Sequence, residues 1–161
     1  GDCLAMKGFA MVTMTLASGA LVDVYTLHAE AGGTAEDQRL QGEDYTQLAD
    51  FIAATSAGRA VIVGGDTNLH TDTTHPDAEG EADTVIWQGF LAAAGLTDAC
   101  AATECPDTGS IDKIAYRSGE GVRLTATSHT MPRERFTAPD GDALSDHPPV
   151  VVEFAWRERR G

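Results

Sequence analysis

Four short polar motifs lie far apart in the sequence, each where an apolar strand is expected to end. Strand ends hold side chains rigidly and leave them open to a ligand, so converging strands could build one preorganised site. Carboxylates, imidazoles and an amide are residue types that can act as acids and bases and can hold the oxygen atoms of a ligand. The motifs are Leu27-His28, Gly64-Gly65-Asp66-Thr67-Asn68, Ile111-Asp112-Lys113-Ile114 and Ser145-Asp146-His147-Pro148-Pro149-Val150.

Ordinary structural roles could explain each motif by itself. Asp66 and Asn68 could be turn formers after a strand, and Asp146-His147 could cap a loop. His28 could be a structural histidine held by hydrogen bonds, and the aspartate of the third motif could belong to a plain cross-strand pair. Each motif is therefore weak alone, and the ordered set carries the interpretation.

The elements that would position these motifs alternate between strands and helices. Apolar alternation between turn residues predicts strands, mostly antiparallel, and helical spacing of apolar residues after the capping residue Thr34 predicts the first helix. The predicted strands cover 9–16, 21–27, 60–63, 110–117, 122–128 and 150–156, the helices cover 34–56 and 84–94, and polar loops cover 72–83 and 128–142.

Residues outside the motifs receive structural assignments. His70, His75 and His129 are expected at the surface or in loops, and Trp87 and Tyr116 in the core. The 161 residues, 42% of them hydrophobic, can bury the core of one domain. We therefore expect a single folding unit over residues 1–161.

The charge of the chain limits its expected partners. Lysine and arginine number 11 against 25 aspartates and glutamates, a net charge of -14. This charge repels a polyphosphate backbone, so nucleic acid stays possible but is not favoured. The sequence has no run of about eighteen apolar residues and no leader features at Gly1-Asp2-Cys3, which predicts neither a membrane span nor a signal peptide; a leader removed by processing stays open.

Three cysteines, Cys3, Cys100 and Cys105, leave several interpretations open. Cys100 and Cys105 enclose a short loop, which suits a local disulfide in an oxidising compartment and leaves Cys3 to pair elsewhere. Free thiols of a cytosolic protein are an alternative. A zinc site is disfavoured, because no CxxC pair and no histidine cluster at ligand spacing accompany the cysteines. The disulfide favours a secreted or periplasmic location.

Taken together, the motifs resemble those of a known family. Gly-Asp-x-Asn at 65–68 and Ser-Asp-His-x-Pro-Val at 145–150, separated by an Asp-x-Ile strand, look like the signature of the endonuclease/exonuclease/phosphatase superfamily. That family includes DNase I-like nucleases, neutral sphingomyelinases and inositol polyphosphate phosphatases. Lys7-Gly8 opens the first strand as a Lys-Gly pair does in the sphingomyelinase-like branch. The resemblance implies an α/β fold, a four-layer α/β/β/α sandwich (DNase I-like) with two mainly antiparallel sheets.

The resemblance also implies catalytic roles for five residues. Asp66 would activate or orient the attacking water, and Asn68 would hold a phosphoryl oxygen. His147 would hydrogen-bond the scissile phosphate, with Asp112 holding its ring. His28 would be the leaving-group acid or a second phosphate contact.

The metal site implied by the resemblance is incomplete in this sequence. Asp146 would bind Mg²⁺, or Ca²⁺ or Mn²⁺, directly or through water. Complete members carry an Asn and then a Glu, the principal metal ligand, on earlier strands, and no such motif follows Gly1. We therefore expect the chain to supply the C-terminal half of the domain and to pack against an N-terminal half of the same protein, because an isolated half would expose its inner sheet faces.

The resemblance implies metal-dependent hydrolysis of phosphoester bonds. The net charge and the scarcity of Arg and Lys near the motifs favour a phosphodiesterase acting on a small or lipid phosphodiester. An extracellular DNase I-like nuclease is one alternative. A non-catalytic binding module with an incomplete metal site is another, and the missing Glu is its only support.

Overall fold

The computed structural model describes residues 7–71 and 81–159, whose strands form two sheets. The larger sheet has the order β1-β2-β3-β5-β4, and the smaller sheet pairs β6 with β7. The strands are β1 (Gly8–Thr15), β2 (Leu21–His28), β3 (Ala60–Asp66), β4 (Thr97–Asp98), β5 (Asp112–Arg117), β6 (Val122–Thr130) and β7 (Val151–Glu158), and the helices are α1 (Ala35–Thr55), α2 (Glu81–Ala94), α3 (Ala99–Thr103) and the 3-10 helix η2 (Arg133–Arg135).

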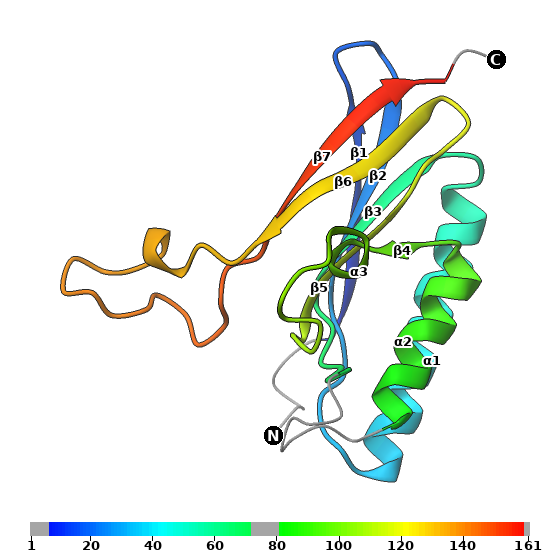
Figure 1. The fold of residues 1–161 in the computed structure, drawn as a ribbon. Coiled ribbons are helices and arrows are strands. Elements are labelled where there is room, and N and C mark those ends of the chain that lie inside the picture. Colours follow the sequence, from blue (N-terminus) through cyan, green and yellow to red (C-terminus); the bar gives the residue numbers. More distant parts are fainter. Residues whose placement is uncertain (1–6, 72–80, 160–161) are drawn as a thin grey trace.

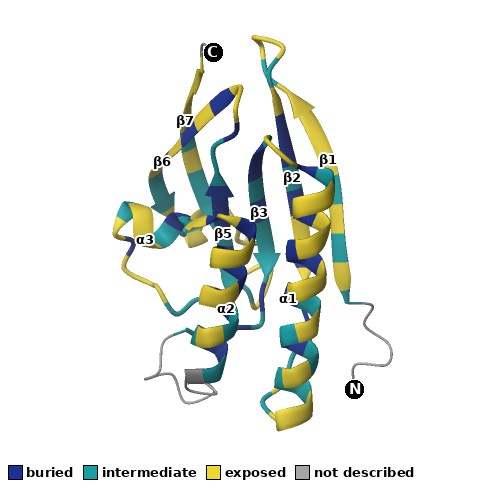
Figure 2. Cartoon of the chain, turned by 90° about the vertical axis from the view of Figure 1, so that its right-hand side faces the viewer, coloured by how far each residue is buried: buried dark blue, intermediate teal, exposed yellow. Residues whose placement is uncertain are grey.

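The long helices α1 and α2 lie side by side on one face of the larger sheet, and the β6-β7 hairpin lies on the opposite face (Figure 1). Tyr45 and Leu48 of α1 pack with Trp87 and Phe90 of α2 beneath the helices. Viewed from the helix side, the outer helix faces are exposed and much of β2 is buried (Figure 2). A second buried cluster contains Val22, Ala60, Ala99, Tyr116, Val122, Leu124 and Ala126. Trp87 and Tyr116 are therefore core residues, as predicted.

Helix α1 shows how the sequence sets the start and the buried side of an element. The hydroxyl of Thr34 accepts a hydrogen bond from the Asp37 backbone amide, and the Asp37 carboxylate accepts one from the Thr34 backbone amide. A cap of this kind stabilises a helix by about 1 kcal/mol. Gln41, Tyr45 and Ile52 recur at helical spacing on the buried side.

Strand register brings three of the sequence motifs into one row. β2 and β3 run parallel with His28 opposite Asp66, and β3 and β5 run antiparallel with Asp66 opposite Asp112. Gly65 permits this pairing, because its φ of 149° and the nearby backbone of Leu27 leave no room for a side chain. The three motifs therefore end side by side on adjacent strands.

The predicted α/β class is confirmed, and the described residues show three of the four expected layers: helices, larger sheet and smaller sheet. Every neighbouring pair of strands except β2-β3 is antiparallel, as expected. Helix α2 begins at Glu81, so Asp83 is helical and not part of the predicted loop, while residues 72–80 lie outside the described residues. The sequence pattern does not predict β4, α3 or η2, which are too short for a periodic signal. Within the described ranges, no helix is long and apolar enough to span a bilayer.

Candidate active site

The predicted site residues gather at one end of the larger sheet, around the carboxylate of Asp66. Its Oδ2 lies 3.4 Å from Nε2 of His28 and 3.9 Å from Nε2 of His147. Asp112 adds a second carboxylate from β5, whose Oδ2 lies 2.9 Å from Nδ1 of His147. Two carboxylates and two imidazoles from four separate segments are thus close enough to act on one ligand.

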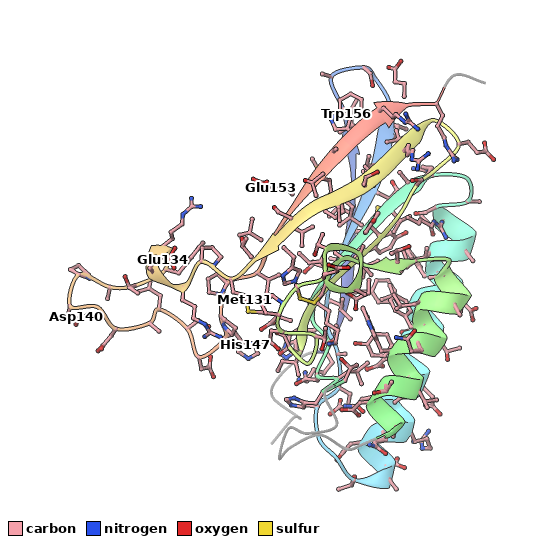
Figure 3. The ribbon with its side chains drawn as sticks, viewed as in Figure 1. Met131, Glu134, Asp140, His147, Glu153 and Trp156 are labelled. Atoms are coloured by element: carbon pink, nitrogen blue, oxygen red, sulfur yellow. A yellow bond between two sulfur atoms is a disulfide. The ribbon has the colours of Figure 1, made fainter. Side chains whose placement is uncertain are left out.

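His147 reaches the site from the segment between β6 and β7, which projects away from the sheets (Figure 3). Its backbone amide donates to Oγ of Ser145 at 3.1 Å. An imidazole nitrogen facing a carboxylate at 2.9 Å carries a proton, so Nδ1 donates to Asp112, and Nε2 lies on the side of Asp66. This hydrogen bond raises the pKa of His147 against the opposing effect of burial. The contact with Asp112 therefore stabilises the cationic form of His147 relative to a free imidazole.

Lys7 joins the site from the start of β1. Its Nζ lies 3.0 Å from Nε2 of His28. An ammonium group has only hydrogens to offer, so Nε2 of His28 accepts this bond and the ring proton lies on Nδ1. The contact between His28 and Asp66 becomes an ion pair when His28 is protonated. In the sequence, the Lys7-Gly8 pair at the strand start points to this residue, but the pair does not predict the contact of Lys7 with His28.

Asn68 follows β3 with a left-handed backbone, at a φ of 50°. Its backbone amide donates to Oδ1 of Asp66 at 3.0 Å, which fixes one carboxylate oxygen. Its side-chain amide donates to the carbonyl of Ala29 at 2.9 Å. An amide nitrogen has two hydrogens, so the second could donate to an oxygen of a ligand.

Buried polar side chains below the site hold the turn after β3. The Tyr45 hydroxyl donates to the Thr67 carbonyl at 2.8 Å, and the Thr67 hydroxyl donates to the Ile111 carbonyl at 2.6 Å. The side-chain amide of Gln41 lies 3.4 Å from the Asn68 carbonyl. Sequence reasoning missed Gln41, although a polar residue one turn before Tyr45 on an apolar helix side is a detectable signal.

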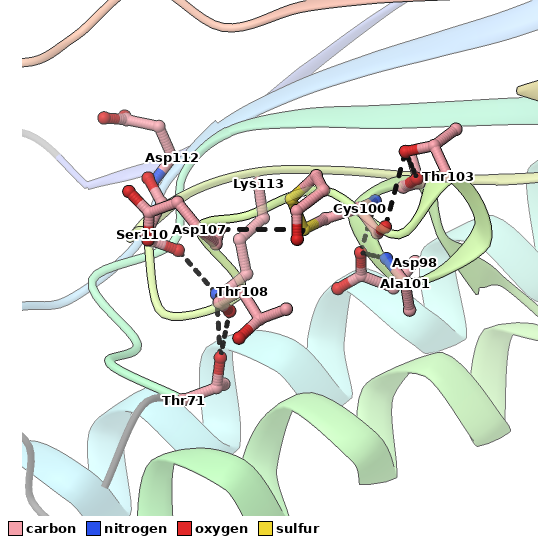
Figure 4. Close-up of a disulfide and its surroundings, with 12 residues drawn as sticks. Thr71, Asp98, Cys100, Ala101, Thr103, Asp107, Thr108, Ser110, Asp112 and Lys113 are labelled. Carbon is pink, nitrogen blue, oxygen red and sulfur yellow. Dashed lines mark hydrogen bonds between the residues drawn. A yellow bond between two sulfur atoms is a disulfide. The ribbon is translucent and has the colours of Figure 1, made fainter. Parts of the chain in front are cut away.

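Lys113 anchors the loop that precedes β5 (Figure 4). Its Nζ donates to Oγ1 of Thr71 at 3.0 Å and to the carbonyls of Thr108 at 3.3 Å and Ser110 at 2.5 Å. The side chain is buried, and burial lowers its pKa to about 8. Strand register places Asp112 opposite Asp66. Asp112 is therefore not in a cross-strand pair of opposite charges, the structural alternative considered for it.

Three side chains of the site could hold a metal ion. One ligand atom from each of Asp66, Asp112 and His147 lies within 4.8 Å of the others. Carboxylate oxygens suit hard cations such as Mg²⁺, Ca²⁺ and Mn²⁺. Asp146, the predicted ligand, is not in this group; it is exposed and lines a pocket with His70, Asp112 and His147. A metal-binding role for Asp146 stays a prediction.

The cysteine and remaining histidine predictions have different outcomes. Cys100 and Cys105 form a disulfide with Cα atoms 4.9 Å apart, which confirms the local pairing. Cys3 and His75 lie outside the described residues. His129 is partly buried in a strand rather than a loop, because β6 continues to Thr130.

The curated relatives of the chain are mycobacterial sphingomyelinases. Those of Mycobacterium tuberculosis and Mycobacterium bovis are each 37% identical to it over 167 residues, covering 95% of this chain and 31% of the relative. The chain thus spans 31% of the length of the relatives it matches. No protein-family model matches it.

Solved structures share the fold at low identity. TDP2 from D. rerio, complexed with a single-strand DNA product, has a TM-score of 0.67 at 16% identity, covering 94% of this chain and 63% of that chain. An endonuclease/exonuclease/phosphatase from Beutenbergia cavernae has a TM-score of 0.65 at 17% identity, covering 92% and 39%. A mutant beta toxin from Staphylococcus aureus with bound magnesium ions has a TM-score of 0.56 at 16% identity, covering 91% and 57%. These identities show a common fold alone.

Proposed function

Because the chain belongs to the endonuclease/exonuclease/phosphatase superfamily, we propose that it is the C-terminal part of a divalent-metal-dependent phosphodiesterase. The row of His28, Asp66 and Asp112 at adjacent strand ends, together with His147, is the observation that supports this most directly. Two carboxylates and two imidazoles in contact offer the base, the acid and the charge-stabilising groups that phosphoester hydrolysis needs.

In this proposal Asp66 orients the attacking water. The backbone amide of Asn68 fixes Oδ1 of the carboxylate, and Oδ2 lies between the two imidazoles. His147, held by Asp112 and favoured as a cation, would donate from Nε2 to a nonbridging oxygen as negative charge grows there. The two residues thus act on the water and on the phosphate, respectively.

Lys7 and His28 would form the opposite wall of the site. The Lys7 ammonium supplies a positive charge for a phosphate oxygen, and its hydrogen bond keeps Nε2 of His28 an acceptor. A His28 that gains a proton would release Lys7 and turn toward Asp66, 3.4 Å away, from where it could protonate the leaving oxygen.

A divalent cation fits the acidic side of the site. The carboxylates of Asp66 and Asp112 would hold it, and the bound ion would neutralise charge on the phosphate oxygens, while His147 keeps both ring protons for Asp112 and the phosphate. Mg²⁺ is the proposed ion, because these donors are oxygens and a beta toxin of the same fold carries magnesium. Two carboxylates do not complete the near-octahedral shell of Mg²⁺, so a carboxylate from the N-terminal half, water or Asp146 would add to it.

The proposed N-terminal half has a surface on which to pack. Val12 and Met14 of β1 are 60% and 51% exposed, although they stand opposite Val24 and Val22, which face the smaller sheet. Trp156 of β7 is 41% exposed. Further strands alongside would cover these apolar side chains. Residues 1–161 would then be one part of a single domain.

A small or lipid phosphodiester is the proposed substrate. The relatives are sphingomyelinases, and the segment that carries His147 exposes Phe136 and Leu144, which are 47% and 68% accessible and line a pocket with His147. Apolar side chains beside the site suit a substrate with an apolar part. The net charge of -14 disfavours a polyanionic nucleic acid.

A secreted or periplasmic location is part of the proposal. The Cys100–Cys105 disulfide supports it, because such bonds persist in oxidising compartments. Digestion of intact cells and of isolated envelope fractions, followed by immunodetection of the chain, tests it.

The proposed activity is tested on the intact protein with sphingomyelin micelles and supercoiled plasmid DNA, each with Mg²⁺ and with EDTA. We expect Mg²⁺-dependent release of phosphocholine that EDTA abolishes, and an intact plasmid. Efficient plasmid nicking would instead identify a nuclease. Failure of both reactions, together with no divalent-metal binding, would identify a binding module.

A further inference from the structure

A second cluster of potential metal ligands contains Cys100, Cys105 and His129. One ligand atom of each lies within 4.8 Å of the other two. Cys100 belongs to α3, Cys105 follows it, and His129 comes from β6. The sequence disfavours a zinc site because it has no CxxC pair and no histidine cluster at ligand spacing, and the fold brings a single histidine to the cysteines from a distant strand.

Contacts that involve no sulfur hold the backbone of these residues in place, and Figure 4 shows those around the disulfide. Asp98 caps α3 by accepting a hydrogen bond from the backbone amide of Cys100 at 2.7 Å. The backbone amide of Cys105 donates to the Cys100 carbonyl at 3.0 Å. His129 is paired with Val152 in the β6-β7 ladder. None of these contacts uses a sulfur atom, so the donors stay together when the disulfide is broken.

The His129 imidazole is available as a ligand. In the part of the chain that the structure describes, its ring makes no hydrogen bond to another residue, and the side chain is partly buried. A neutral imidazole offers one lone pair, which is what a divalent transition metal requires.

We propose that reduction of the Cys100–Cys105 disulfide converts this cluster into a binding site for a borderline-soft divalent cation, of which Zn²⁺ fits best. The reductant is a separate dithiol compound or protein. It gives two electrons and two protons to the two cysteine sulfurs, and it is itself oxidised to a disulfide. Metal binding then releases the two thiol protons as both thiolates coordinate. Water, or the carboxylate of Asp107, whose backbone carbonyl lies 3.6 Å from Sγ of Cys100, would occupy the fourth position.

The ligand set and its spacing suit this ion. With Zn–S near 2.3 Å and Zn–N near 2.0 Å, ligand atoms in a tetrahedral site lie roughly 3.5 to 3.8 Å apart. The three atoms already lie within 4.8 Å of one another, so modest side-chain rotation closes them around an ion. Thiolate donors also separate this site from the oxygen-rich one at Asp66, which prefers hard cations.

Cobalt binding to the full chain tests the proposal in a Cys3→Ser background, which removes the third thiol. Co²⁺ serves as the probe, because thiolate-to-cobalt charge transfer gives an absorption band that oxygen ligands do not. After reduction with a phosphine, one equivalent of Co²⁺ is expected to produce the band, and Zn²⁺ is expected to remove it. The oxidised chain is expected to show no band.

Two variants separate the sites. His129→Gln is expected to weaken Co²⁺ binding more than about 100-fold, beyond the loss caused by an outer-shell partner. His147→Gln alters the other cluster and is expected to leave the band unchanged. Circular dichroism and re-formation of the disulfide on oxidation check that each variant is folded.

A measurement without a histidine variant completes the test. In the reduced Cys3→Ser chain, Zn²⁺ is expected to slow alkylation of both remaining cysteines, counted by intact mass. The proposal is overturned if the reduced chain gives no charge-transfer band, if folded His129→Gln binds as tightly as the parent, or if Zn²⁺ leaves alkylation unchanged.

Discussion

The two histidines beside Asp66 have partners of opposite charge. On one side, Nδ1 of His147 donates to the Asp112 carboxylate at 2.9 Å, and this bond raises the pKa of the imidazole. On the other side, Nε2 of His28 faces the Lys7 ammonium at 3.0 Å. The same residue type is thus held as a donor on the Asp112 side and as an acceptor on the Lys7 side. The difference leaves Nε2 of His147 able to donate to a ligand, whereas Nε2 of His28 is occupied as an acceptor from Lys7.

Substitution of Asp66, which both sides share, is expected to have the largest effect. Asp66→Asn keeps the shape but removes the charge between the imidazoles, so we expect kcat to fall by about 10⁴-fold, the upper range for a general base. Steady-state kinetics on a phosphodiester with Mg²⁺ provide the measurement. Asp50→Asn, on the exposed side of α1, is the matched control and should retain wild-type activity. An Asp66→Asn enzyme within tenfold of wild type, on the order of 1.4 kcal/mol, would exclude the proposed role.

The two histidines are expected to differ in their contribution. His147→Asn removes a positioned donor to the phosphate and should lower kcat by about 10³-fold. His28→Asn should lower kcat by about 10²-fold, the low end for a general acid, because Lys7 remains to supply positive charge on that side. Equal losses in the two variants would contradict the asymmetry between the two sides.

Asp112→Asn tests the cause of that asymmetry directly. The variant should bring the pKa of His147 down toward 6.5, as followed by NMR titration of the metal-free chain, and lower kcat by about 10- to 100-fold. The folded-state pKa is raised, so the interaction stabilises the fold fully below the unfolded pKa near 6.5 and is lost as pH rises through the raised value. Asp112→Asn should therefore destabilise the chain more in acid than in alkali. A His147 titration unchanged from wild type would mean that Asp112 is not the cause.

The composition of this site could be predicted from the sequence because its members stand at the ends of recognisable apolar segments. His28 and Asp66 each close a strand, and the motif around His147 is specific in its order of residues. The placement of His28 opposite Asp66 could not be predicted, since it depends on parallel pairing of β2 with β3 across α1. Register of this kind is set by tertiary packing and leaves no local signal.

The contacts of three further side chains could not be predicted for a different reason. Lys7 precedes the first apolar strand, where periodicity assigns nothing, and Lys113 follows Asp112 yet turns into the interior. His129 was placed beyond its strand because the apolar alternation of β6 fades at the bulge between Ala126 and Ser128. In each case a contact far away in sequence decides where the side chain lies.

Substitution of Lys7 is expected to have the smallest effect, and it tests whether Lys7 controls His28. Lys7→Met removes the donor to Nε2 of His28, so the ring is free to carry its proton on Nε2 and to donate to Oδ2 of Asp66, 3.4 Å away. We expect ¹⁵N shifts to report this change of tautomer, and kcat/KM to fall by about tenfold, on the order of 1.4 kcal/mol, as one positive charge leaves the phosphate site. Lys7→Arg keeps the cation and should preserve the wild-type tautomer. If Lys7→Met leaves the His28 shifts unchanged, the hydrogen bond does not set the tautomer, and the contrast between the two histidines rests on Asp112 alone.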